Sequence, residues 1–213
     1  MDVQFYGANC VKISTKKATL VLDDNLASIG LKPATKPGDV ALFSGAHTAP
    51  ATEVKLMIDQ PGEYEVSDIS IRGIAARSHM DESDVKPGGG SATIFKITYD
   101  DIDLVSLGHV YPELSDAQLE AIGTVDVLLV PVGGNGYTLD PVGALKLIKK
   151  IEPKLVIPTH YADKAINYEV PQQDLENALK ELSMEPKETV DKLKLKSADL
   201  MTDVTQLIVV NRQ

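Results

Sequence analysis

The sequence predicts an α/β fold. Its first half consists mostly of short apolar runs that are typical of strands, and its second half alternates helix and strand patterns. Neither an internal repeat nor an obvious linker interrupts the chain. A chain of 213 residues is long enough to bury about 70% of its unfolded surface. We therefore expect residues 1–213 to form a single domain.

The first half contains eight predicted strands, most of them close to Gly, Pro or Asn residues that favour turns. Residues 39–44 are almost continuously apolar, and residues 53–59 alternate as a half-buried strand does. The predicted strands are residues 3–6, 10–14, 19–22, 39–44, 53–59, 64–66, 69–77 and 92–98. The glycine-rich stretch at 88–90 is the segment that we expect to move most.

The second half contains three predicted helices between strands. Ser115 and Gln118 form the pattern of a capping box at a helix start, and Gly123 is suited to end that helix. Asp140 followed by Pro141 is a favourable start for the second helix. The predicted helices then cover residues 115–123, 140–151 and 172–182, and the predicted strands cover residues 103–107, 125–132, 155–159, 192–195 and 206–210.

Composition and charge exclude several classes of partner. The formal net charge is -10 and the pI is about 4.8, so the surface repels phosphate backbones and we expect no nucleic-acid binding. There is no run of about 18 apolar residues and no secretory signal pattern, which predicts no membrane association. A single cysteine, Cys10, suits a reducing compartment, so we expect a cytoplasmic protein.

The four histidines are the residues most suited to chemistry. His47, His79, His109 and His160 each lie at or just beyond a predicted strand end, where an open α/β sheet binds its ligands. No two of them are close enough in sequence to form a local chelating pair. We expect His109 to shape the turn before Tyr111, and the other three to be candidate metal ligands.

Several segments, taken in order, resemble the metallo-β-lactamase superfamily. The similarity is to its short, single-domain, hydrolase-like branch, which includes sugar-lactone hydrolases. It implies a four-layer αββα sandwich of two mixed sheets, with a metal site at the shared strand ends. The matching segments are QFYGANCVKI at 4–13, LVLDDNL at 20–26, DVALFSGAHTAP at 39–50, PGEYEV at 61–66, ARSHMDE at 76–82, LVSLGH at 104–109, VDVLLVPVGG at 125–134 and PKLVIPTHY at 153–161.

The chain departs from this family in its metal-binding motif. The family pattern H-x-H-x-D-H falls on residues 45–50. Only His47 matches it, because Gly45, Ala49 and Pro50 stand where the family has His, Asp and His.

Other family ligands are partly retained. His79 and His160 match the two later histidines of the family, whereas Ser106 replaces the aspartate that bridges two metal ions. Ala8 replaces a histidine in the turn near the N-terminus.

The remaining ligands are too few for the two metal ions of the family. A catalytic zinc ion normally has three protein ligands and a water molecule. The resemblance leaves His47, His79 and His160 as candidate ligands, with Asp23 and Glu63 (and Asp81) as weaker carboxylate candidates. Asp23 is expected either to hydrogen-bond to a metal ligand without binding the metal itself, or to belong to a solvated acidic loop. One zinc or other divalent ion, or no ion, is expected.

Two functions remain open. The first is a protein with a degenerate metal site that binds a small molecule or takes part in assembly, without the standard dinuclear activity. The second is a divergent mononuclear metal-dependent hydrolase of an ester, lactone or phosphoester, so the sequence leaves catalysis undecided. A homo-oligomer is expected from the resemblance alone. The loop at 133–136 is expected to form the rim of a pocket.

Overall fold

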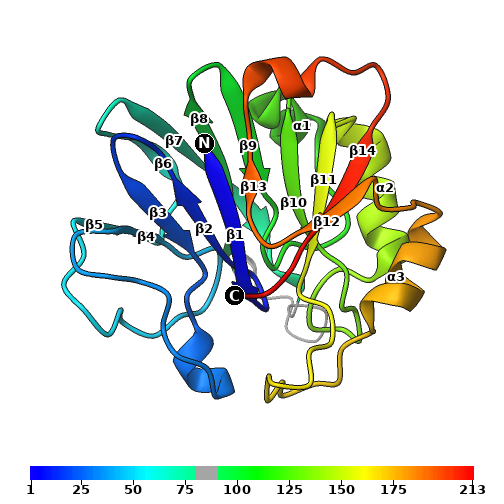
Figure 1. Cartoon of the computed structure of the whole chain (residues 1–213), viewed down its shortest axis with the longest axis horizontal. Coiled ribbons are helices and arrows are strands. Elements are labelled where there is room, and N and C mark those ends of the chain that lie inside the picture. The colour runs from blue at the N-terminus through cyan, green and yellow to red at the C-terminus, as the bar shows by residue number, and fades with distance from the viewer. Residues whose placement is uncertain (80–90) are drawn as a thin grey trace.

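The computed structural model describes residues 1–79 and 91–213, and the carboxylate candidate Asp81 lies outside these ranges. Two mixed sheets pack face to face (Figure 1). This arrangement confirms the predicted fold class. In the described part of the chain no helix is long and apolar enough to cross a membrane.

The first sheet has the strand order β13-β1-β2-β3-β4-β5. It is antiparallel from β13 to β3 and parallel from β3 to β5. The strands are β1 (Asp2–Gly7), β2 (Cys10–Ser14), β3 (Thr19–Leu22), β4 (Val40–Leu42), β5 (Leu56–Ile58) and β13 (Leu193–Lys194).

The second sheet has the strand order β12-β14-β11-β10-β9-β8-β7-β6. It is parallel from β12 to β9 and antiparallel from β9 to β6. The strands are β6 (Gly62–Val66), β7 (Ile69–Arg77), β8 (Ser91–Tyr99), β9 (Ile102–Ser106), β10 (Val127–Pro131), β11 (Leu155–Thr159), β12 (Glu188–Val190) and β14 (Gln206–Val210).

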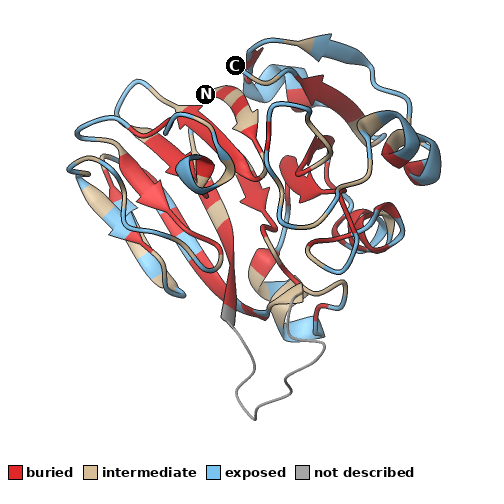
Figure 2. Cartoon of the chain, turned by 90° about the horizontal axis from the view of Figure 1, so that it is seen from below, coloured by how far each residue is buried: buried red, intermediate tan, exposed pale blue. Residues whose placement is uncertain are grey.

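The central strands β10 and β11 of the second sheet are buried on both faces, and β10 shows why such a strand is apolar throughout. Val127 and Leu129 point into the core between the sheets, whereas Leu128 and Val130 point into the core beneath the helices. Alternate side chains of a strand lie on opposite faces, so a strand covered on both faces needs continuous apolar sequence. The buried strands of both sheets are red in Figure 2.

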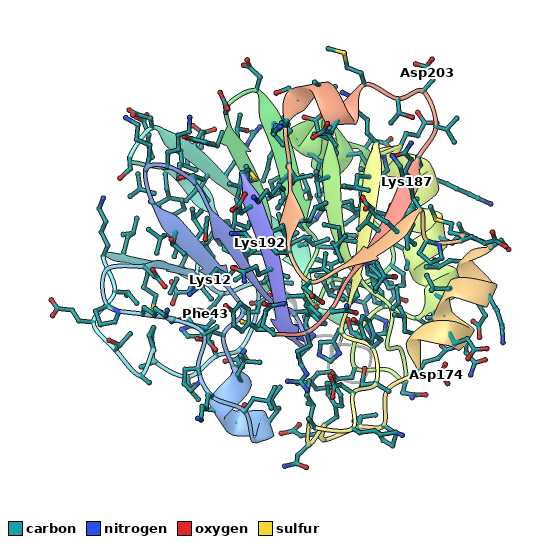
Figure 3. The ribbon with its side chains drawn as sticks, in the orientation of Figure 1. Lys12, Phe43, Asp174, Lys187, Lys192 and Asp203 are labelled. Atoms are coloured by element: carbon teal, nitrogen blue, oxygen red, sulfur yellow. The ribbon has the colours of Figure 1, made fainter. Side chains whose placement is uncertain are left out.

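Three helices cover the outer face of the second sheet: α1 (Asp116–Ile122), α2 (Pro141–Ile151) and α3 (Leu175–Leu182). The capping box of Ser115 and the N-cap of Asp140 are confirmed. The third helix starts three residues later than predicted, because Asp174 (labelled in Figure 3) accepts a hydrogen bond from the Asn177 N–H and caps it. Gln172, which was predicted to begin this helix, instead lines the cleft described below.

The outer face of the first sheet has a thinner cover. A short 3-10 helix, η1 (Leu26–Ile29), and the loop after it pack on Cys10 and Val21. Lys12 reaches this loop and donates a hydrogen bond to the Ala34 carbonyl at 2.7 Å. A second 3-10 helix, η3 (Ser197–Leu200), precedes β14.

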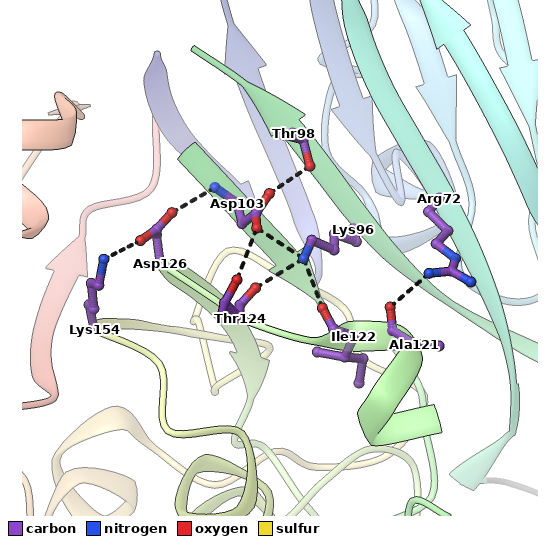
Figure 4. A network of polar contacts seen from close by, with 9 residues as sticks. All are labelled: Arg72, Lys96, Thr98, Asp103, Ala121, Ile122, Thr124, Asp126 and Lys154. Carbon is purple, nitrogen blue, oxygen red and sulfur yellow. Dashed lines mark hydrogen bonds and ion pairs between the residues drawn. The ribbon is translucent and has the colours of Figure 1, made fainter. Parts of the chain in front are cut away.

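A polar network joins the second sheet to α1 (Figure 4). Lys96 Nζ donates to the carbonyls of Ile122 at 2.9 Å and Thr124 at 3.0 Å, and it pairs with Asp103 at 2.9 Å. Asp126 accepts a hydrogen bond from the Asp103 N–H and pairs with Lys154. The lysine therefore supplies donors to one carbonyl in the last residue of α1 and to one just beyond its end.

Replacing Lys96 by methionine is expected to lower the free energy of unfolding by about 2 kcal/mol, since the Asp103 carboxylate and two carbonyls lose a charged donor. Urea unfolding of the variant measures the change. Arg72→Met is the matched control, because Arg72 is half-exposed and donates one bond, to the Ala121 carbonyl. It is expected to cost less than about 1 kcal/mol. Equal losses in the two variants would contradict this account of the network.

Candidate functional site

A cleft of about 270 Å³ lies where the strands of both sheets end. Its wall is formed by the β1–β2 turn, by the loops after β3 and β4 and by the loops after β9, β10 and β11. These segments meet along the lower edge of Figure 1, where the blue turn of η1 faces the yellow loop after β11. Carboxyl ends of parallel strands are where open α/β sheets bind ligands.

Three of the four histidines line this cleft. His47 follows β4, His109 follows β9 and His160 follows β11. The rings of His109 and His160 are 5.2 Å apart between centroids, at 81° to each other. Tyr137 and Tyr168 lie against the same cluster, with centroids 5.6 and 5.4 Å from that of His160. The cleft therefore has an aromatic wall centred on His160.

The hydrogen bonds of His160 fix its tautomer. Its Nδ1 lies 3.1 Å from Oε1 of Gln172, whose Nε2 donates to the Val170 carbonyl. The amide is thus oriented so that Oε1 accepts, and His160 Nδ1 carries the proton. This leaves Nε2 of His160 as an acceptor.

The other two cleft histidines have the same pattern. His109 Nδ1 lies 3.4 Å from the Tyr137 carbonyl, and His47 Nδ1 lies 3.3 Å from the Gly45 carbonyl. A carbonyl only accepts hydrogen bonds, so both Nδ1 atoms carry the proton. His47 also stacks on Phe43 at 4.1 Å, and its Nε2 lies 3.7 Å from a carboxylate oxygen of Asp59.

Burial keeps the central imidazoles neutral. Desolvation lowers the pKa of His160 to about 3. The same cause lowers the pKa of His109, although the charge of Asp23 acts in the opposite direction. Desolvation also raises the pKa of Tyr137, to which Glu169 adds, and that of Tyr168.

Asp23 lines the cleft but is not solvated, so the expectation of a solvated acidic loop is wrong for this residue. It is 5% exposed, and its carboxylate accepts from the Ser44 N–H and from the Ser44 hydroxyl, each at 2.7 Å. Desolvation raises its pKa. The carboxylate fixes the start of the loop that carries His47.

Three residues of the cleft wall have a strained backbone. Ala8, Asp23 and His160 all have left-handed φ values, of 48°, 45° and 53°. Such conformations are uncommon outside glycine and occur often at functional sites. The His160 N–H donates to the Ala8 carbonyl at 2.7 Å, so two of these residues support each other across the two sheets.

The other sequence candidates lie elsewhere. His79 is absent from the described wall of the cleft; its N–H donates to the His109 carbonyl, and its Nδ1 is buried without a partner among the described residues. Glu63 lies on β6, where it is 82% exposed and 3.7 Å from Arg72. The structure thus brings together His47, His160 and Asp23 of the predicted set.

Several cleft residues were not predicted. His109 was expected only to shape a turn, and Tyr137, Tyr168 and Gln172 were not considered. His109 could have been found, since it follows a buried strand in the same way as His160 does. None of residues 133–136, which were expected at the rim, lines the described cleft, although the loop leads into Tyr137, which does.

The donors in the described residues do not fit a pair of metal ions. No three His, Cys, Asp or Glu side chains in residues 1–79 and 91–213 are grouped so that they could hold an ion. Both oxygens of Asp23 already accept hydrogen bonds from Ser44. Two-metal sites need a ligand set for each ion at about 3.5–4 Å separation. The described residues of this cleft do not supply two such sets.

Comparison with known proteins decides the family. A model of the β-lactamase superfamily domain matches residues 2–160 of the chain, about three quarters of its length. The chain belongs to the metallo-β-lactamase superfamily. This confirms the resemblance inferred from the sequence.

Relatives agree with this assignment. A protein of Salinibacter ruber named "UPF0173 metal-dependent hydrolase" is 24% identical over 192 residues, which cover 76% of this chain and 84% of the relative. A protein of the same name from Thermococcus onnurineus is 30% identical over 102 residues, 47% of this chain and 44% of the relative. The names state that these relatives are metal-dependent.

Solved structures show the same fold. A member of the superfamily from Thermotoga maritima superimposes with a TM-score of 0.75 at 24% identity, covering 100% of this chain and 99% of the other. A metallo hydrolase from Ignicoccus hospitalis gives a TM-score of 0.61 at 16% identity, covering 99% and 94%. At these identities the likeness establishes the fold alone.

Proposed function

We propose that this protein binds a small molecule in the cleft and lacks the dinuclear hydrolase activity of its superfamily. The observation that carries this proposal is the donor set: no three potential ligands are grouped among the described residues, and the Asp23 carboxylate is already engaged. The cleft itself is retained. Its volume of about 270 Å³ is several times the share of one water molecule, about 30 Å³.

The aromatic wall supports binding as the role of the cleft. Pockets for small molecules are mostly apolar and have a few placed polar groups. Here Tyr137 and Tyr168 supply apolar area, and His109, His160 and Asn9 supply polar atoms. The core between the sheets is shared by β1, β10 and β14, so we also propose that residues 1–213 act as one domain.

A second candidate is a mononuclear metal-dependent hydrolase. One observation favours it: His47, His109 and His160 all hold their Nδ1 proton against an oxygen. This leaves Nε2 of His109 and His160 as acceptors, whereas Nε2 of His47 faces the Asp59 carboxylate. Metal-binding histidines commonly have this arrangement. The names of the relatives agree with a divalent metal in general.

Restoring the family ligands tests the proposal. We expect the wild type to show no zinc-dependent hydrolysis of nitrophenyl esters, lactones or nitrophenyl phosphates. The variant Gly45→His, Ala49→Asp, Pro50→His, Ser106→Asp should gain zinc affinity by at least about tenfold, since loss of even a hydrogen-bond partner of a metal ligand costs about 10- to 100-fold. Zinc-dependent turnover by the wild type, abolished in His47→Ala and His160→Ala, would refute the proposal and establish the second candidate.

A further inference from the structure

The wall of the cleft carries negative charge and no lysine or arginine among its described residues. Asp23 is buried there and Glu169 is exposed. The whole chain has a formal net charge of -10. A phosphate or carboxylate that entered would meet repulsion and no lysine or arginine partner in the described wall, so the cleft is unsuited to anions.

The rings of the cleft suit a cation. Tyr137 and Tyr168 flank His160 at centroid distances of 5.6 and 5.4 Å, and His109 lies 5.2 Å from both Tyr137 and His160. The face of an aromatic ring carries negative electrostatic potential and attracts organic cations. Tyr137 is only half-buried, so its ring is accessible from the cleft.

The polar atoms of the wall add acceptors and a buried donor without a partner among the described residues. With the proton on Nδ1, Nε2 of His109 and of His160 are acceptors. Asn9 is 5% exposed, and its Nδ2 has no partner among the described residues, while its Oδ1 accepts from the Thr159 hydroxyl. A buried amide donor without a partner is costly, and a ligand oxygen would satisfy it.

We propose that the cleft binds a small organic ammonium ion that also carries a hydroxyl group. The aromatic rings and Glu169 face the ammonium group, and Asn9 donates to the hydroxyl oxygen. This inference rests on the proposed function, because two metal ions in the cleft would repel such a ligand.

Isothermal titration with choline and its uncharged isostere 3,3-dimethyl-1-butanol tests the inference at constant ionic strength. Choline is expected to bind with a Kd on the order of 1 mM. The isostere has the same shape and hydroxyl group, and it should bind at least about tenfold more weakly, because it lacks the charge. Acetate and inorganic phosphate should give no binding heat at the same concentrations.

Variants locate the binding. Tyr137→Leu should weaken choline binding by about fivefold or more and leave the weak binding of the isostere nearly unchanged. Glu169→Gln should weaken choline binding by about threefold. Glu185→Gln is the matched control: it removes one exposed negative charge near α3, outside the cleft, and should change nothing.

The outcomes separate the inference from the proposed function. Equal affinity for choline and the isostere, preference for acetate or phosphate, or no heat with choline overturns the inference. A loss in Glu185→Gln equal to that in Glu169→Gln also overturns it, since the attraction would then come from overall charge. A parallel titration with Zn²⁺ that saturates at two ions per chain refutes the proposed function, whatever choline does.

Discussion

Lowering the pH from 7 to 4 is expected to reduce the free energy of unfolding by about 3 kcal/mol through His160 alone. Burial lowers its folded pKa to about 3, whereas an unfolded histidine has a pKa near 6.5. Below pH 6.5 the His160 imidazole is protonated in the unfolded chain and stays neutral in the folded chain until the pH approaches 3. Stability is therefore present at neutral pH and is lost as the pH falls from about 6.5 towards 3.

Neighbouring groups modify this loss. His109 also has a lowered pKa and acts in the same direction. Asp23 has a raised pKa, so the folded state binds its proton more readily and offsets part of the loss on acidification. Gln172 and the two tyrosines that pack on His160 are neutral over this range.

Urea unfolding at pH 7, 5.5 and 4 measures the loss, and His160→Asn should flatten it, since asparagine tolerates the left-handed φ at this position. A second measurement is independent of the variant. The imidazole proton signals of His160 should not shift between pH 7 and 5 in NMR spectra. Titration of His160 near pH 6.5 would contradict its burial in the cleft wall.

Gly133→Ala is expected to lower the free energy of unfolding by about 3 kcal/mol and to abolish binding in the cleft. A Cβ atom at Gly133 would lie 2.0 Å from the His160 carbonyl oxygen and 2.1 Å from Gln172 Oε1. The first of these oxygens is a backbone atom of His160, and the N–H of the same residue donates to the Ala8 carbonyl. To relieve the clash, the loop after β10 must shift relative to the His160 backbone and to the Gln172 side chain.

Gly45→Ala is the control for this variant. Its Cβ atom would come no closer than 4.0 Å to the side chain of His109, and we expect a change within about 0.5 kcal/mol. Thermal and urea unfolding compare the two variants directly. A Gly133→Ala protein as stable as the wild type would show that the loop after β10 does not hold His160.

Local sequence signals predicted most of the fold. The capping residues Ser115 and Asp140 satisfy helix N–H groups within a few positions, so their role is visible in the sequence. The continuous apolar run of β10 likewise follows from burial on both faces. β12 was missed because its three residues are mostly exposed and carry no alternation.

The site was less predictable because its contacts join distant segments. His160 was placed near a strand end by pattern, but the hydrogen bond that joins the preceding residue, Thr159, to Asn9 spans 150 positions. Asp23 was expected either in solvent or as a hydrogen-bond partner of a metal ligand. Nothing near it in sequence reveals that both of its carboxylate oxygens accept hydrogen bonds from Ser44. Neither its burial nor the role of Gln172 has a local signal.

The stoichiometry of bound metal tests the central claim most directly. Untagged protein is dialysed to equilibrium with zinc, manganese or iron(II) salts in turn, and the metal content per chain is measured by elemental analysis. Fewer than two ions per chain with every metal is the expected result, and the restored variant with ligands at positions 45, 49, 50 and 106 is the positive control. Two ions per wild-type chain, lost together in His160→Ala, would contradict the account.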